Sequence, residues 1–208
     1  MKRFFLSALA ILALGGIAAS QVNQVPQIGV NTANLRQNTY VAAIHGLIPA
    51  ASTTDFFCIS GSTSKTIKIH RVELSGSGTL GSAPIYLNHN STLDTGTAAV
   101  VATYGPVAYP LMSSNPAATA VVTAYNTTGG NPTIGGTATI FRVGNIVVSP
   151  TASTTIGMDR LVWQFGTATS LYDQSLIIPP NTTEQICVNL AASSLTAVLG
   201  GTIEWTEE

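Results

Sequence analysis

The sequence has little charge and few aromatic residues. Charged residues make up 8% of the 208 residues, aromatic residues make up 7%, and the formal net charge is −1. Proteins that bind nucleic acid present a clustered basic face to the phosphates, and so weak a charge does not provide one. The sequence therefore predicts no nucleic-acid partner and a surface built mainly from hydroxyl and amide groups.

Cysteine and histidine are also scarce. The two cysteines, Cys58 and Cys187, lack a CxxC partner, and the three histidines, His45, His70 and His89, fall in different expected strands. Zinc sites usually take closely spaced Cys and His ligands, so the sequence predicts no metal and no cofactor. In an exported chain, an even cysteine count favours a disulfide, which would contribute about 4 kcal/mol by loop closure. Two free thiols are the alternative.

A long apolar run occurs at the N-terminus. The opening "MKRFFLSALAILALGGIAAS" joins a basic start, an apolar segment from Phe4 to Leu14, and small residues at positions 18 and 20. This order predicts a secretory signal peptide over residues 1–20. A retained anchor is the alternative, but the run is short for the roughly 20 residues that cross a bilayer. We therefore expect an exported mature chain without a stable membrane span, located in the periplasm, outside the cell or on a surface.

The rest of the chain has the pattern of a β protein. Residues 21–38 are polar and without a regular period, which predicts a flexible N-terminal arm. From residue 39 to 208, short alternating segments are separated by Gly, Pro, Asn or Ser, and none has the composition of a surface helix. These segments predict an all-β domain, a single antiparallel β-sandwich of jelly-roll-like type. An immunoglobulin-like sandwich is the alternative.

The charged stretch "TSKTIKIHRVELSG" contains a break in alternation. Ile67 and Ile69 share one parity, whereas Val72 and Leu74 share the other. A one-residue slip of this kind is produced by a β-bulge, which we place at residues 70–71. The bulge would keep all four apolar side chains in the core. Two charged residues of the stretch would then face solvent: Lys68 and Glu73.

The acidic residues do not form a recognisable catalytic arrangement. They are scattered along the chain: Asp55, Glu73, Asp94, Asp159, Asp173 and Glu184. Asp55 precedes an apolar segment, where a side chain that makes a turn is expected. "DTGT" from Asp94 matches the triplet of aspartic proteases without its usual flanking residues, and we interpret it as a turn. The sequence predicts a protein that is not an enzyme. An exported hydrolase is a weaker alternative, which would need His70 or His89 beside an acid in a cleft.

Two tyrosines mark a candidate contact loop. Tyr104 and Tyr109 lie in a segment interrupted by Pro106 and Pro110, which predicts an edge strand or a loop. Exposed aromatic rings provide contact area for ligands. The alternative function is therefore a module that binds glycans or cell-surface ligands.

Four segments resemble a family of poorly characterised, β-rich structural proteins from bacterial genomes and phage-like sequence sets. They are "TDFFCISGSTSKTIKIHRVELSG", "PAATAVVTAY", "DRLVWQFG" and the terminal "IEWTEE", within residues 40–208. The resemblance implies a non-enzymatic structural protein of a virion or extracellular particle, and it implies no catalytic residues. Together with the signal peptide, it predicts an exported structural or surface-interaction protein that associates with itself or with other structural proteins.

Overall fold

The computed structural model describes one of two units of the chain. Residues Met1–Arg36 form the first unit and Gln37–Glu208 the second. The described residues are 37–50, 52–78, 81–96, 108–125, 131–148, 160–166, 174–180, 183–191 and 197–208. The predicted signal peptide lies outside them, and so does the predicted arm apart from Gln37 and Asn38.

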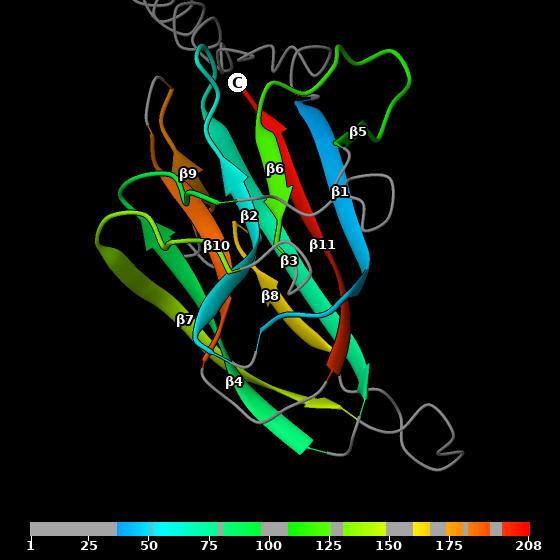
Figure 1. Ribbon diagram of the computed structural model, residues 1–208. Coiled ribbons are helices and arrows are strands. Elements are labelled where there is room, and N and C mark those ends of the chain that lie inside the picture. Colours follow the sequence, from blue (N-terminus) through cyan, green and yellow to red (C-terminus); the bar gives the residue numbers. More distant parts are fainter. Residues whose placement is uncertain are drawn as a thin grey trace, which may run out of the picture. The chain divides into compact units, whose positions relative to one another are not determined.

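The described residues form eleven strands in two antiparallel sheets (Figure 1). Sheet A has the order β5-β1-β11-β3-β8, with β9 also on β3, and sheet B has the order β6-β2-β10-β4-β7. No helix that could span a membrane occurs in this part of the chain. The strands are β1 (Asn38–Leu47), β2 (Thr54–Ser60), β3 (Ile67–Gly78), β4 (Gly81–Asn90), β5 (Tyr109–Pro110), β6 (Val121–Ala124), β7 (Ala138–Val148), β8 (Leu161–Gln164), β9 (Leu176–Ile178), β10 (Gln185–Leu190) and β11 (Ala197–Glu207).

Strand pairing is nested from the ends of the domain inward. β1 pairs with β11, β2 with β10, β3 with β8 and β9, and β4 with β7, while β1 to β4 alternate between the two sheets. Figure 1 shows the red β11 between β1 and β3. A long hairpin wound into two sheets in this way is a jelly roll. The predicted antiparallel sandwich is confirmed, and the immunoglobulin-like alternative, with its different strand order, does not apply.

The core lies between the two sheets and follows the alternation of the sequence. On β11, Leu199, Ile203 and Trp205 are buried, as their shared parity predicts. The Trp205 ring stacks on Tyr40 of β1, with ring centroids 5.8 Å apart. Each fully buried apolar side chain contributes about 1.5–3 kcal/mol relative to exposure, so the two inward faces hold the sheets together.

The predicted bulge in β3 is confirmed at His70. Arg71 pairs with Glu204 and Ile69 with Trp205, so His70 has no opposite residue on β11. All four predicted core residues are fully buried: Ile67, Ile69, Val72 and Leu74. One extra residue thus restores the inward direction of the apolar side chains after the parity changes.

The charged side chains of β3 lie on its outer face, where they form ion pairs. Lys68 pairs with Glu208, and Glu73 pairs with both Arg71 and Arg160. The Arg71 Nη2 to Glu73 Oε2 distance is 2.6 Å. Partly exposed pairs of this kind contribute little stability individually.

A buried carboxylate joins the end of sheet A to the segment that enters sheet B. Glu207 of β11 accepts hydrogen bonds from the backbone N–H of Thr119 at 2.8 Å and of Ala120 at 3.0 Å. It also accepts hydrogen bonds from the Thr119 hydroxyl at 2.7 Å and from Trp205 Nε1 at 3.2 Å. Burial alone would raise the pKa of Glu207, but these hydrogen bonds to the charged form outweigh burial and lower it.

Candidate functional site: a carboxylate pair beside a disulfide

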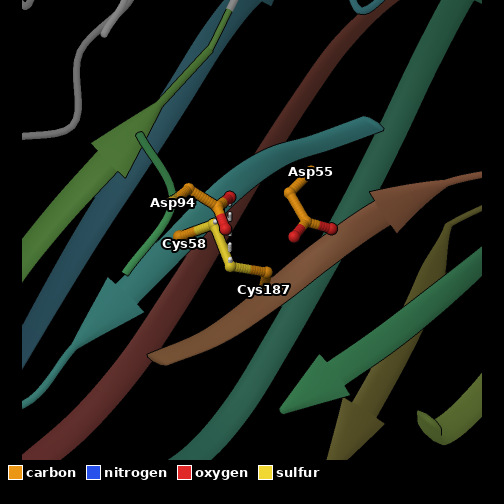
Figure 2. A group of neighbouring side chains, drawn as sticks. All are labelled: Asp55, Cys58, Asp94 and Cys187. Atoms are coloured by element: carbon orange, nitrogen blue, oxygen red, sulfur yellow. Dashed lines mark hydrogen bonds between the residues drawn. A yellow bond between two sulfur atoms is a disulfide. The ribbon is translucent and has the colours of Figure 1, made fainter. Parts of the chain in front are cut away.

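The two cysteines form a disulfide within sheet B. Cys58 of β2 and Cys187 of β10 are direct register partners, with their Cα atoms 4.1 Å apart (Figure 2). Such a short separation is typical of the non-hydrogen-bonded pairs of an antiparallel ladder, where the two side chains lie on the same face. The predicted Cys58–Cys187 pairing is therefore confirmed, and the free-thiol alternative is wrong.

A bulge in β2 brings Asp55 to the same face as the disulfide. Phe56 is the extra residue, with no register partner on β10. Phe56 and Phe57 both join the main core, whereas Cys58 belongs to a separate outer cluster. Strict alternation along the segment "TDFFCISG" would place Phe56 on the same face as Cys58, and the bulge shows that this interpretation is wrong. Asp55 is fully buried within β2 instead of making a turn before the strand.

Asp94 reaches the same place from the turn that follows β4. Its Oδ1 accepts a hydrogen bond from the backbone N–H of Gly135 at 2.8 Å. The bridge between Thr95 and Thr133 holds the two loop segments together. Asp94 Oδ2 then lies 3.7 Å from Cys58 Sγ. Figure 2 shows the carboxylate of Asp94 beside the disulfide. The turn predicted for "DTGT" is consistent with this position, but no local pattern indicated the partner of Asp94.

Two buried asparagines complete the cluster. Asn90 of β4 donates through Nδ2 to Asp55 Oδ2 at 2.7 Å and to Asp94 Oδ1 at 3.0 Å. Asn189 of β10 donates through Nδ2 to Asp55 Oδ1 at 2.6 Å. In the described part of the chain, the Oδ1 atoms of both asparagines have no hydrogen-bond partner. Both amides are therefore held by the carboxylates.

Burial sets the electrostatics of the pair. It raises the pKa of Asp94 to about 6, and the neighbouring charge of Asp55 acts in the same direction. The hydrogen bonds from Gly135 and Asn90 act in the opposite direction and lower this pKa. Burial also raises the pKa of Asp55. Because the two acids are neighbours in a poorly solvated place, ionising both at once is disfavoured, and the pair retains a proton more readily than an isolated carboxyl group does.

Among the residues that the structure describes, no cation compensates the charge of the two acids. The ion pairs found among the described residues do not include Asp55 or Asp94. Burial raises the pKa of the adjacent Tyr125 to about 12, and the charges of Asp94 and Asp55 add to this, so the phenol stays neutral. A buried carboxylate beside a half-buried one, without a cationic partner in the described part of the chain, favours a shared proton or a bound cation.

The three histidines lie on separate strands, β1, β3 and β4. His70 Nε2 is 2.9 Å from Thr206 Oγ1, and its Nδ1 is 3.3 Å from Ser175 Oγ. In a Ser-His-Asp triad, one ring nitrogen of the histidine contacts the serine and the other contacts an acid, which balances the imidazolium charge. Both ring nitrogens of His70 contact a hydroxyl instead, and a hydroxyl cannot balance that charge. Burial lowers the pKa of His70, and nearby Lys68 adds to this.

His89 does contact an acid. Its Nε2 lies 3.1 Å from Glu184 Oε2, and its ring stacks on Phe141. His45 lines a shallow hollow on the surface together with Ser77 and Val198. The first condition of the hydrolase alternative, a histidine beside an acid, is therefore met at His89. The contacts found for His89 in the described part of the chain include no nucleophile.

Half of the predicted contact loop can be located. Tyr109 lies on β5 with 63% of its surface exposed, and the next large apolar residues, Leu111 and Met112, are also exposed. Tyr104 lies outside the described residues. The structure thus offers an exposed ring at one of the two predicted positions.

The comparisons with known proteins provide no relative from which a function could be transferred. No protein-family model, no curated protein and no solved structure matches this chain. Functional inference therefore rests on the geometry alone.

Proposed function

We propose that this chain is an exported, non-enzymatic structural or surface-interaction protein whose copies associate through their edge strands. In this proposal it is a component of an extracellular or virion-like particle. The observation that carries the proposal is the exposed apolar half of β7. Jelly rolls occur in both capsid and lectin domains, so the fold alone does not choose between assembly and ligand binding.

β7 is an edge strand with uncovered apolar side chains. All residues from Ala138 to Val143 are exposed, including Ile140 at 53% and Val143 at 63%. β7 is the last strand of sheet B, and β4 is its partner among the described strands. The segment holds neither Lys nor Pro, which commonly block edge pairing, and Arg142 is its one charged residue. A bulge at Phe141 interrupts its ladder with β4.

Other exposed apolar residues gather on the remaining edges. They lie on or next to β5, β6, β8 and β9: Tyr109, Leu111, Met112, Val121, Val162 and Ile177. Loss of Lys2 and Arg3 with the signal peptide would leave 6 basic and 9 acidic residues, a net charge of −3. Repulsion between copies is weak at so low a charge, which favours a second copy of this chain as the partner of β7.

Export is supported by two independent features. The N-terminus has the basic, apolar and small-residue segments of a secretory signal. The Cys58–Cys187 disulfide is typical of proteins that mature in an oxidising compartment.

Light scattering after size exclusion tests the proposal on the mature chain, residues 21–208. We expect an assembly larger than a monomer. Val143→Lys should shift it toward monomer, because a lysine on the free edge opposes strand pairing. Ile177→Lys on β9 is the matched control, since this residue is similarly exposed at 50% on another edge. A monomer at all concentrations, or equal effects of the two substitutions, would refute assembly through β7.

The exposure of Tyr109 favours a second function, binding of glycans or cell-surface ligands. A glycan array with the monomeric Val143→Lys variant would separate this function from assembly. Selective binding that is lost in Tyr109→Ala would support it, because stacking of a sugar on the ring requires the aromatic face. An array without signal would leave assembly as the better account.

A further inference from the structure

We propose that the reduced form of this protein binds one zinc ion through Asp55, Cys58, Asp94 and Cys187. Each of these residues offers one ligand atom, and all four atoms lie within 4.8 Å of one another. Figure 2 shows them converging from β2, from β10 and from the turn after β4. The spacing in the sequence predicts no metal site, because the fold alone brings these residues together.

The ligand set fits tetrahedral zinc. Zinc takes thiolate sulfur at about 2.3 Å and carboxylate oxygen at about 2.0–2.2 Å, which places neighbouring ligand atoms about 3.3–3.8 Å apart. The carboxylates therefore need to move only slightly inward. Once the disulfide is reduced, rotation of the Cys58 and Cys187 side chains can separate the sulfurs to this distance. Four anionic ligands leave the same formal charge on zinc as in a centre made of four cysteine thiolates.

The buried amides provide independent support, because they are directed at the ligand atoms. Asn90 is fully buried, and its Nδ2 lies 2.7 Å from Asp55, 3.0 Å from Asp94 and 3.6 Å from Cys187 Sγ. Asn189 is 1% exposed and donates to Asp55, while its Oδ1 has no partner in the described part of the chain. Donors of this kind orient metal ligands and partly offset their negative charge.

Metal binding and the disulfide exclude each other at this site. A newly made chain carries two thiols, and each loses a proton when its sulfur binds zinc. Oxidation by the disulfide of an exchange protein removes two electrons from the two thiolates and forms the S–S bond. The exchange protein is left with two thiolates, which take up two protons from the solvent to give its dithiol. The zinc ion is released. Zinc would thus link β2 to β10 in a reducing compartment, and the disulfide would link them after export.

The test uses the mature chain, the metal alone and a phosphine reductant. After reduction, Co²⁺ should produce the intense visible absorption of a tetrahedral site with a sulfur-to-cobalt charge-transfer band, and one equivalent of Zn²⁺ should abolish both. The oxidised chain should show neither band. Asp94→Asn should weaken Zn²⁺ binding by at least about tenfold, since a neutral amide is a poor zinc ligand. Glu204→Gln, which removes an acid from the outer face of sheet A, should leave the affinity unchanged.

Reduction of the disulfide could itself unfold the chain, so the fold of the reduced chain is measured by circular dichroism with and without Zn²⁺. Reduced protein that folds only with Zn²⁺, and less well in Asp94→Asn, would support the site. Reduced protein that folds without taking up metal would overturn it, as would reduced protein that stays unfolded with Zn²⁺ present. Binding that is equally tight in Asp94→Asn would also overturn it, because the cysteines alone would then account for the metal.

Discussion

The carboxylate of Glu207 accepts hydrogen bonds from both the backbone N–H and the hydroxyl of Thr119, across the gap between the two sheets. Since β11 belongs to sheet A and Thr119 leads into β6 of sheet B, this contact fixes how the last strand meets the other sheet. Glu207 is 3% exposed, so a replacement cannot recover these bonds from water.

We expect Glu207→Gln to lower the free energy of unfolding at pH 7 by about 2 kcal/mol, because hydrogen bonds to a buried charged group are strong. The pKa of Glu207 is lowered by folding, so its contribution is complete above the ordinary value of 4.5 and is lost as the pH falls through the folded value. Urea unfolding between pH 7 and pH 3 should therefore show a steeper acid loss in the unmodified chain than in the variant. Glu204→Gln, at a partly exposed acid, is the control, and parallel pH curves for Glu207→Gln and the unmodified chain would contradict the prediction.

Removal of the Cys58–Cys187 disulfide should lower the free energy of unfolding more than Glu207→Gln does. Cys58 and Cys187 are 129 residues apart, and the chain-entropy model assigns about 4–5 kcal/mol to a loop of that length. We expect the double substitution Cys58→Ala and Cys187→Ala to lower the free energy of unfolding by this order, measured in urea without added metal. A thiol reductant should destabilise the unmodified chain but not the double variant. Equal stability of the two chains would mean that the unfolded state is little affected by the cross-link.

A methyl group at Gly135 should disturb the turn that places Asp94. A Cβ there would lie 2.2 Å from the Thr92 backbone oxygen and 2.5 Å from that of Leu93, both of which are fixed backbone atoms. We expect Gly135→Ala to lower the melting temperature by several degrees, which corresponds to about 1–3 kcal/mol of overpacking. Gly200→Ala is the matched control, since its Cβ would lie no closer than 3.4 Å to any neighbour. A similar melting temperature for both variants would argue against the described position of the 135 loop.

The bulge in β3 predicts an unequal effect of two single-residue deletions. Deleting His70 removes the extra residue and leaves regular alternation from Ile67 to Leu74, at the cost of contacts such as the 2.8 Å hydrogen bond from the Phe165 N–H to the His70 carbonyl. Deleting Lys68 instead turns one isoleucine out of the core, and burial of such a side chain is worth about 1.5–3 kcal/mol. Thermal unfolding should show the larger loss for the Lys68 deletion. The reverse order would mean that the contacts of His70 matter more than the strand parity.

Alternation along single strands was predictable because it depends only on neighbouring residues. The shared parity of Leu199, Ile203 and Trp205 identified an inward face, and the parity change after Ile69 identified the bulge. The bulge at Phe56 left no comparable sign, because "DFFC" places apolar residues on both parities. Its consequence, Asp55 beside the disulfide, was therefore missed.

Residue order alone was enough to specify an all-β sandwich and the place in β3 where its apolar face changes direction, since backbone pleating converts residue order directly into side-chain direction. Which distant residues meet depends instead on how the strands assemble. Strand register and a turn join Asp55, Asp94 and the Cys58–Cys187 pair, over separations that no local pattern encodes. The arrangement of strands within the domain also leaves the apolar half of β7 uncovered, because exposure of a strand depends on whether another strand lies beside it.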